Sequence, residues 1–198
     1  LTSSRYEKDR SLFIHPLKFS KTSNLALCDI RSADNKDRWI VLVDLEKLTI
    51  KELNHQHDDA WIGGPGISSW NEEVAVLDWL EDEKSFYFQS EETGYSHLYT
   101  CDIETGNKKA ISSGNFEIHQ VQLSKDKKRF FITANKTHPG NRDFYHLDIK
   151  SLAWTTILSV DGFVIELLRI CSKTVNTILS LYIIWYSPLR INQNYRPP

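Results

Sequence analysis

The chain has 198 residues, of which 40% are hydrophobic and 12% aromatic, and this is enough apolar side chain to form a core. Its formal net charge is −2, so the composition argues against binding to nucleic acid or to an anionic membrane surface. Eight Tyr and nine Phe residues favour β-sheets over helices.

Three cysteines lie far apart in the sequence, with no C-x-x-C spacing. Cys28 and Cys101 fall inside apolar runs, so we interpret them as small buried hydrophobic residues rather than as a disulfide or a reactive thiol. The chain begins with Leu1 instead of Met, and its first residues show neither a signal segment nor a strand pattern. We therefore expect the chain to be part of a longer protein.

Residues 1–53 are predicted to form a first unit of four strands. The inner strand is expected within residues 11–19, where Pro16 limits the hydrogen bonding that a strand can make. The remaining strands of this unit are predicted at residues 25–30, 39–45 and 49–53.

A second unit, residues 54–111, opens with an insertion at residues 54–73. Long loops on repeat scaffolds tend to carry function, because the scaffold fixes their ends while their tips are free to vary. Residues 91–94 and 104–107 each contain a Gly, which accepts positive φ at a turn without steric cost. The strands of this unit are predicted at residues 74–79, 85–89, 97–102 and 108–111.

A third unit is predicted at residues 112–160, and the character of the chain changes after it. Residues 161–198 are rich in Ile, Leu and Val but lack the signature of a further unit. Their apolar run, residues 178–186, is far shorter than the ~20 residues that a membrane span requires. We expect an irregular tail, with a buried helix, a strand pair or a departure from the parental reading frame as alternatives. The strands of the third unit are predicted at residues 117–123, 129–134, 143–149 and 154–158.

Two markers recur along the chain and define its repeat. The run at residues 80–88 (LEDEKSFYF) has a partner at residues 123–131 and a weaker one at residues 19–27. Successive copies of either marker lie roughly 43 to 61 residues apart, the longer step spanning the insertion. The second marker is an aspartate next to an apolar strand run, and it occurs at Asp44, Asp102 and Asp148.

A repeat of this length with four short strands per unit is typical of propeller blades. The predicted fold class is therefore all-β: an incomplete β-propeller of about three four-stranded antiparallel blades, followed by an irregular C-terminal tail. We expect each of the three repeated aspartates to end the third strand of its own blade.

The insertion contains a candidate metal-binding pattern, His55-x-His57-x-Asp59. Two imidazoles and a carboxylate are suitable zinc donors, but Ala60 stands where the metallo-hydrolase form of this motif has another His. No later His or Cys pair has ligand-like spacing. A polar loop at a blade edge is the favoured interpretation, so no metal and no other cofactor is predicted.

Catalytic motifs are missing from the sequence. A serine hydrolase of the α/β type needs a nucleophile elbow, G-x-S-x-G, and neither residues 63–66 nor residues 94–96 supply it. No phosphate-binding G-x-x-x-x-G-K run is present. The sequence therefore offers no catalytic residue.

Two pairs of glutamates are candidates for binding a cation. Glu72 and Glu73 follow Trp70, and adjacent carboxylates beside an aromatic ring could hold a protonated amine, because partial desolvation strengthens the ion pair. An exposed acidic turn is the alternative interpretation. Glu91 and Glu92 stand in a predicted turn, where exposure is the stronger expectation.

The run from residue 59 to residue 149 resembles the N-terminal β-propeller of dipeptidyl peptidase IV-type enzymes, in the prolyl oligopeptidase family of serine peptidases. The similarity is closest to bacterial members, and the tail after Lys150 departs from the family altogether. It is carried by four stretches: AWIGGPG at residues 60–66, FYFQSEETGYSHLY at residues 86–99, VQLSKD at residues 121–126, and HPG with RDFY at residues 138–145.

The resemblance implies a two-domain exopeptidase that removes dipeptides from peptide N-termini, often after proline or alanine. In that family an eight-bladed propeller caps an α/β-hydrolase domain, which carries the catalytic Ser, Asp and His and has no counterpart in this chain. Trp61, Gly63 and Gly64 match a family loop that lines the far side of the substrate pocket. The family's amine-binding glutamates come from an earlier propeller segment than Glu72 and Glu73.

The sequence thus predicts the propeller portion of a dipeptidyl peptidase IV-like serine exopeptidase that is inactive without its hydrolase domain. The alternative is a stand-alone propeller that binds proteins or peptides, and an independent metalloenzyme is a further rival. Candidate substrate-binding residues are Trp61, Gly63, Gly64, Glu72 and Glu73. The expected partners are peptide substrates, with no nucleic acid, no membrane span, and self-association through open blade faces. By resemblance, the compartment is periplasmic or extracellular.

Overall fold

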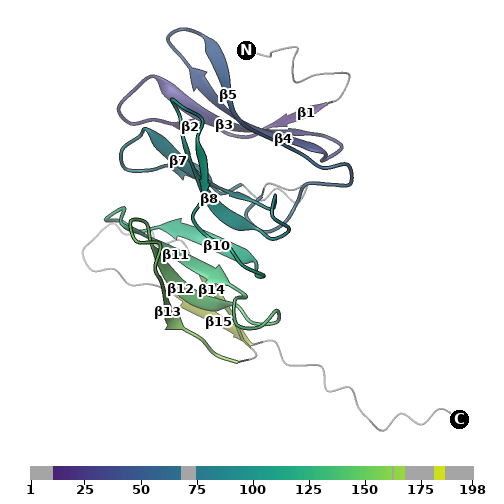
Figure 1. Cartoon of the computed structure of the whole chain (residues 1–198), viewed down its shortest axis with the longest axis vertical. Helices are drawn as coiled ribbons and strands as arrows, with labels where there is room; N and C mark the ends of the chain where they lie inside the picture. Colours follow the sequence, from purple (N-terminus) through teal and green to yellow (C-terminus); the bar gives the residue numbers. More distant parts are fainter. Residues whose placement is uncertain (1–10, 68–74, 162, 168–180, 186–198) are drawn as a thin grey trace, which may run out of the picture.

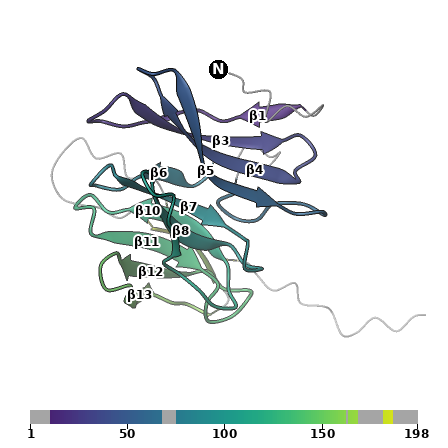
Figure 2. The ribbon, with the colours of Figure 1, turned by 45° about the horizontal axis from the view of Figure 1, so that its top comes forward.

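The computed structural model describes residues 11–67, 75–161, 163–167 and 181–185, the last two ranges as backbone only. Every regular element in these ranges is a β-strand. Three antiparallel sheets follow one another along the molecule, as Figures 1 and 2 show from two directions. The all-β prediction of about three propeller blades is confirmed.

The first blade is a five-stranded sheet rather than a four-stranded one. Its innermost segment, predicted as one strand, is split into two short strands that both pair with the same neighbour. Pro16 lies in the gap, where its missing N–H costs the ladder no hydrogen bond. The strands are β1 (Leu12–Ile14), β2 (Lys18–Phe19), β3 (Leu25–Ser32), β4 (Asp37–Asp44) and β5 (Thr49–His57).

Strand β5 is longer than predicted. It runs to His57, so His55 and His57 belong to a strand and not to a loop, and the connection to the second blade begins at Asp58. The extra length pairs with β4 through the registers Trp39↔His55 and Asp37↔His57. The end of the first blade is therefore a rigid ladder that leads directly into the inserted loop.

The second and third blades are four-stranded meanders in which each strand pairs with the next along the chain. The second contains β6 (Leu77–Trp79), β7 (Ser85–Ser90), β8 (His97–Asp102) and β9 (Lys108–Ala110). The third contains β10 (Ile118–Leu123), β11 (Arg129–Ala134), β12 (Asp143–Asp148) and β13 (Trp154–Leu158).

The tail is more regular than predicted. Strands β14 (Phe163–Leu167) and β15 (Leu181–Trp185) pair antiparallel, and β14 lies against β10, β11 and β12. Both strands are rich in β-branched residues, which favour extended backbone. The prediction of an irregular tail is wrong for these ten residues, and the strand-pair alternative is correct for them.

The three repeated aspartates occupy equivalent positions. Asp44, Asp102 and Asp148 end β4, β8 and β12, the third strands of the three blades, as predicted. In each case the side-chain Oδ1 accepts backbone N–H groups from the residues two and three positions later, at 2.7–3.1 Å. The carboxylate thus fixes the turn into the outer strand, which explains why the residue recurs.

The core consists of apolar layers between successive blades. Because side chains alternate between the two faces of a strand, each blade presents one apolar face to each neighbour. The layer between the first and second blades contains Leu27, Ile40, Leu42, Leu53, Leu77, Trp79, Phe86, Phe88, Tyr99 and Cys101. The layer between the second and third contains Tyr87, Leu98, Ile111, Phe116, Ile118, Phe130, Ile132, Ala134, Tyr145 and Leu147.

Cys28 and Cys101 are buried free thiols, as predicted. Cys101 lies in the layer between the first and second blades, and Cys28 lies in a separate apolar cluster of the first blade, with Ala26, Ile30, Trp39, Val41 and Val43. Burial raises the pKa of the Cys28 thiol to about 11, so it carries almost no thiolate at neutral pH. Cys171 lies outside the described residues.

Candidate functional site

The loop at residues 58–66, which follows the last strand of the first blade, is held by several hydrogen bonds. Asp58 Oδ1 accepts the backbone N–H groups of Ala60 and Trp61, at 2.7 and 3.1 Å. The Ile62 N–H donates to the carbonyl of Asn35 at 2.7 Å, and the Gly63 N–H donates to the Glu91 carboxylate. Four successive N–H groups therefore have acceptors, and the loop backbone is fixed.

At two glycines in this loop, an added side chain would meet neighbouring side chains. A Cβ at Gly63 would collide with the Trp61 indole, which lies over it. Gly66 has φ 68°, in the left-handed region, and a Cβ there would collide with the Gln89 amide. The glycines thus allow Trp61 and Gln89 to pack closely against the loop backbone.

The far end of the loop is attached to the second blade. The Gln89 side-chain amide donates to the carbonyls of Pro65 and Ile118, at 3.2 and 2.8 Å. The Ser96 hydroxyl donates to the Pro65 carbonyl at 2.7 Å. Gln89 and Ser96, within the stretch 86–99 that carried much of the family resemblance, therefore position the loop.

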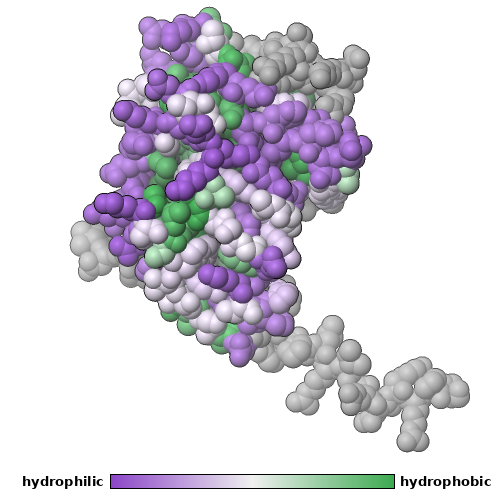
Figure 3. All heavy atoms as spheres, in the orientation of Figure 1, coloured by the Kyte–Doolittle hydropathy of each residue, from purple (hydrophilic) through white to green (hydrophobic). Residues whose placement is uncertain are grey.

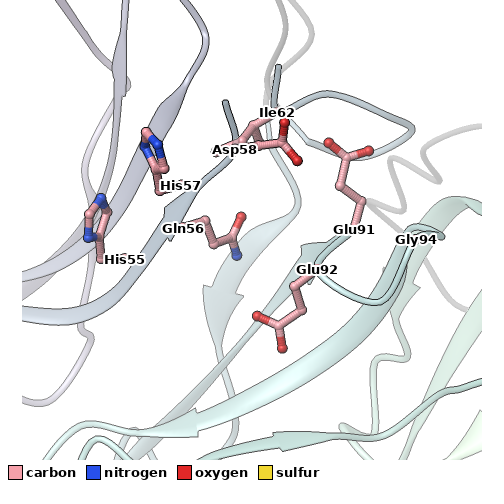
Figure 4. Close-up of a pocket in the computed structure, with 8 residues that line it drawn as sticks. All are labelled: His55, Gln56, His57, Asp58, Ile62, Glu91, Glu92 and Gly94. Carbon is pink, nitrogen blue, oxygen red and sulfur yellow. The ribbon is translucent and has the colours of Figure 1, made fainter. Parts of the chain in front are cut away.

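A pocket of about 400 Å³ opens beside this loop, between the end of β5 and the turn that joins β7 to β8. Figure 4 shows the side chains of Asp58 and Glu91 near Ile62, while Glu92 points away from them. Trp61, which precedes the pocket-lining Ile62 in the sequence, is 54% exposed. The pocket is lined by His55, Gln56, His57, Asp58, Ile62, Glu91, Glu92 and Gly94.

The two glutamates of the turn have different surroundings. Burial raises the pKa of Glu91, the Gly63 N–H opposes this shift, and the nearby carboxylates of Glu117 and Asp58 add to it. Glu92 instead forms an ion pair with Lys108. Exposure of both residues was the stronger expectation from the sequence, and it is wrong for Glu91, which is half-buried.

Both histidines of the candidate metal motif bind one buried carboxylate. His55 Nε2 and His57 Nδ1 lie 2.8 and 2.9 Å from Asp37 Oδ1, and His57 Nε2 lies 3.2 Å from Asp59. Hydrogen bonds to Asp37 and Asp59 raise the pKa of His57. Within the described ranges, no group of three or more His, Cys, Asp or Glu side chains is arranged to hold a metal ion.

The structure brings together three of the five predicted site residues. Trp61, Gly63 and Gly64 lie on the fixed loop beside the pocket. Glu72 and Glu73 lie outside the described residues. From the sequence, Glu91 is a cation-binding candidate for which exposure is the favoured expectation, because nothing in a Glu-Glu pair distinguishes a half-buried carboxylate from a solvated one.

No helix in the described ranges is long and apolar enough to cross a membrane.

Comparison with known proteins gives one family match and several distant relatives. The family model described as the dipeptidyl peptidase IV (DPP IV) N-terminal region matches residues 2–165. The match continues past Lys150 into β14, so the similarity extends further than the sequence alone suggested.

Two fungal relatives carry the name "Probable dipeptidyl peptidase 4". The protein from Arthroderma benhamiae is 20% identical over 120 residues, which are 59% of this chain and 15% of the relative. The protein from Neosartorya fischeri is 23% identical over 126 residues, 60% of this chain and 15% of the relative. The matched part of the chain thus spans about a seventh of the length of these relatives.

Solved structures show the same fold. Dipeptidyl peptidase 4 from Porphyromonas gingivalis superposes with a TM-score of 0.64 at 19% identity, covering 79% of this chain and 21% of that one. TolB from Acinetobacter baumannii gives a TM-score of 0.51 at 18% identity, covering 77% and 35%. With the family model matching most of its length, the chain belongs to the family of the dipeptidyl peptidase IV N-terminal region.

Proposed function

We propose that the chain is the propeller portion of a dipeptidyl peptidase IV-like serine exopeptidase. In this role it admits and orients peptide substrates, while a separate α/β-hydrolase domain supplies the catalytic Ser, Asp and His. Family membership and the names of the relatives support the proposal. The short share of each relative that the chain covers is consistent with a function divided between domains.

The observation that carries the proposal is the fixed loop with its exposed indole beside a pocket that contains carboxylates. The protonated amino terminus of a peptide is a cation, which Asp58 and Glu91 attract. The Trp61 indole offers apolar contact area and a π face for the same end of the peptide. The loop is held before any ligand arrives, so little ordering entropy is lost on binding.

The proposal is tested by titrating the 198-residue chain, labelled with 5-fluorotryptophan, with the tripeptide Ala-Pro-Ala. The Trp61 resonance is assigned from the Trp61→Phe variant. We expect a saturable shift of this resonance and no cleavage of the tripeptide by mass spectrometry.

N-acetyl-Ala-Pro-Ala, which lacks the positive charge, is the matched control peptide and should bind at least tenfold more weakly. A Trp61 resonance that does not respond to millimolar tripeptide, or that responds equally to both peptides, contradicts the proposal.

A stand-alone binding propeller is the second candidate function. The hydrogen bonds that Asp58, Glu91, Gln89 and Ser96 make to the loop lie within the described propeller residues, so the propeller itself positions the loop. The coding sequence downstream distinguishes the two candidates, since an exopeptidase requires a G-x-S-x-G motif there and a stand-alone propeller does not.

We also propose a periplasmic or extracellular location, which rests on the family resemblance alone. Fractionation of cells that express the native gene, followed by immunoblotting, tests it. Recovery of the protein only with the cytoplasmic marker would contradict the proposal.

A further inference from the structure

The peptide unit between Ile62 and Gly63 is bonded from both sides by charged side chains. Arg31 Nη2 donates to the Ile62 carbonyl, and the adjoining Gly63 N–H donates to Glu91 Oε1. Arg31 belongs to β3 of the first blade, and Glu91 to the turn after β7 of the second. One planar peptide group is therefore held between a guanidinium and a carboxylate that come from two different blades.

Arg31 is unusual among the buried cations of the described ranges. It is 3% exposed, and its Nε and Nη1 atoms have no hydrogen-bond partner. Burial and the neighbouring Arg38 lower its pKa. Arg38, by contrast, donates to the Asp29 carboxylate at 3.0 and 2.7 Å and to the Gln89 carbonyl at 2.6 Å.

A buried charge with unsatisfied donors costs stability, and the nearby carboxylates of Asp29 and Glu91 offset only part of that cost, since the pKa of Arg31 is still lowered. Its described hydrogen bond is the one to the loop. The ionised form of Glu91 is likewise costly, because its carboxylate is half-buried and near the acidic groups of Glu117 and Asp58. Its carboxylate nevertheless accepts the hydrogen bond from the Gly63 N–H.

We infer that Arg31 and Glu91 are positioning residues that clamp the Ile62–Gly63 peptide unit and thereby hold the Trp61 indole over Gly63. Hydrogen bonds to ionised groups are stronger and more directional than neutral ones. A guanidinium on the carbonyl and a carboxylate on the N–H polarise the peptide group in the same direction, so each bond strengthens the other. The consequence for peptide binding rests on the proposed function; the clamp itself does not.

The test is amide hydrogen exchange at Gly63, measured by NMR on the full chain, with the fluorine resonance of Trp61 as a second readout. Glu91→Ala removes the acceptor and should accelerate exchange at Gly63 at least tenfold and shift the Trp61 resonance. Glu91→Gln keeps a weaker acceptor and should give an intermediate rate. Arg31→Lys, which keeps one charged donor, should stay closer to the wild-type rate than Arg31→Met.

Glu92→Ala is the matched control, because Glu92 lies in the same turn but binds Lys108. It should leave exchange at Gly63 unchanged. Thermal melts separate positioning from global stability: burial raises the pKa of Glu91, so its ionised form costs stability at neutral pH. Glu91→Gln should therefore leave the melting temperature unchanged or raise it, even as Gly63 exchanges faster.

The inference is overturned if Gly63 in folded Glu91→Ala exchanges within twofold of the wild type, or if Glu92→Ala accelerates it equally. It is also overturned if Glu91→Gln lowers the melting temperature and accelerates exchange throughout the second blade. Absence of tripeptide binding by the wild-type chain would overturn the proposed function and leave the clamp standing, because the exchange readout involves no peptide.

Discussion

Single side chains also connect the blades, in addition to the apolar layers, and Glu83 is one such residue. Its carboxylate, in the second blade, accepts hydrogen bonds from the Ser20 and Thr22 hydroxyls of the first at 2.6 and 2.7 Å. The backbone N–H groups of Lys21 and Thr22 donate to it as well, at 2.9 and 3.0 Å. These bonds lower the pKa of Glu83 to about 2.

The low pKa of Glu83 predicts a specific acid sensitivity. A carboxyl group whose folded pKa lies below its ordinary value of 4.5 contributes stability above that pH and loses it as the pH falls toward 2. In Glu83→Gln this part of the acid destabilisation should be missing. Thermal melts of both chains between pH 5 and pH 2 measure it, and parallel curves would show that Glu83 does not contribute.

Three equivalent turns give a second prediction at the level of single residues. Four positions after each repeated aspartate, Leu48, Gly106 and Leu152 all have positive φ, at 54°, 73° and 58°. A leucine in this region is strained by about 1–2 kcal/mol. Glycine removes this strain, but it loses more backbone entropy on folding than leucine does, which cancels part of the gain. Leu48→Gly should therefore stabilise the chain by about 0.5–1 kcal/mol in urea unfolding.

Gly106→Leu is the reciprocal control for this turn. Nothing lies within 4 Å of a Cβ built at Gly106, so the substitution tests backbone strain without a clash, and it should destabilise by a similar amount. A Leu48→Gly variant less stable than the wild type would show that contacts of the leucine side chain outweigh its backbone strain.

At the scale of elements, the inserted loop depends on one close contact. An alanine at Gly63 needs no unusual backbone angle, yet its methyl group would displace the Trp61 indole. Gly63→Ala should therefore weaken tripeptide binding about tenfold or more with little change in melting temperature. Gly140→Ala, which lies in the third blade outside the pocket lining and needs no positive φ, is the control for tripeptide binding. Equal tripeptide affinities of the wild type and Gly63→Ala would show that the position of the Trp61 indole does not affect binding.

Strand prediction succeeded where apolar residues alternate and failed where polar residues form the ladder. Residues 129–134 and 154–158 were predicted to the residue, because their pattern is plain in the sequence. The end of β5 was missed: Asn54 and Gln56 are buried by bonding to Lys108 and Ser90 of the second blade. The alternation of apolar residues in the sequence does not reveal polar side chains that are buried by hydrogen bonds to another blade.

The candidate site was predictable in part for the same reason. Trp61, Gly63 and Gly64 stand out in the sequence as an aromatic residue followed by glycines in a long insertion. Arg31 and Glu91 do not, because each acts on the loop from another blade. Their role depends on the way the blades stack, which no local pattern encodes.

At the scale of the whole molecule, blade stacking is the main source of stability. Figure 3 shows a surface dominated by hydrophilic side chains, with smaller apolar patches between them. Phe88 is fully buried in the layer between the first two blades, with its ring 5.7 Å from that of Tyr99. Phe88→Ala should cost about 3–5 kcal/mol, through lost burial and a cavity at the interface.

Urea unfolding followed by near-ultraviolet circular dichroism measures this cost. Tyr95→Ala, at a partly exposed turn position, is the control and should change stability by less than about 0.5 kcal/mol. A small loss for Phe88→Ala, comparable to that of Tyr95→Ala, would mean that the first two blades unfold independently.

The most direct measurement on the chain as a whole is a cleavage assay with Ala-Pro-p-nitroanilide at high protein concentration. The sequence contains no G-x-S-x-G nucleophile elbow, and the nucleophile, base and oxyanion donors supply most of the acceleration in a serine peptidase. We predict no release of p-nitroaniline above the buffer rate. The contradicting result is release of p-nitroaniline that scales with chain concentration and persists through repurification. If this release also persists in the His55→Ala/His57→Ala variant and is blocked by a serine-directed fluorophosphonate, the chain cleaves its substrate, and the account of a propeller that only binds substrate is wrong.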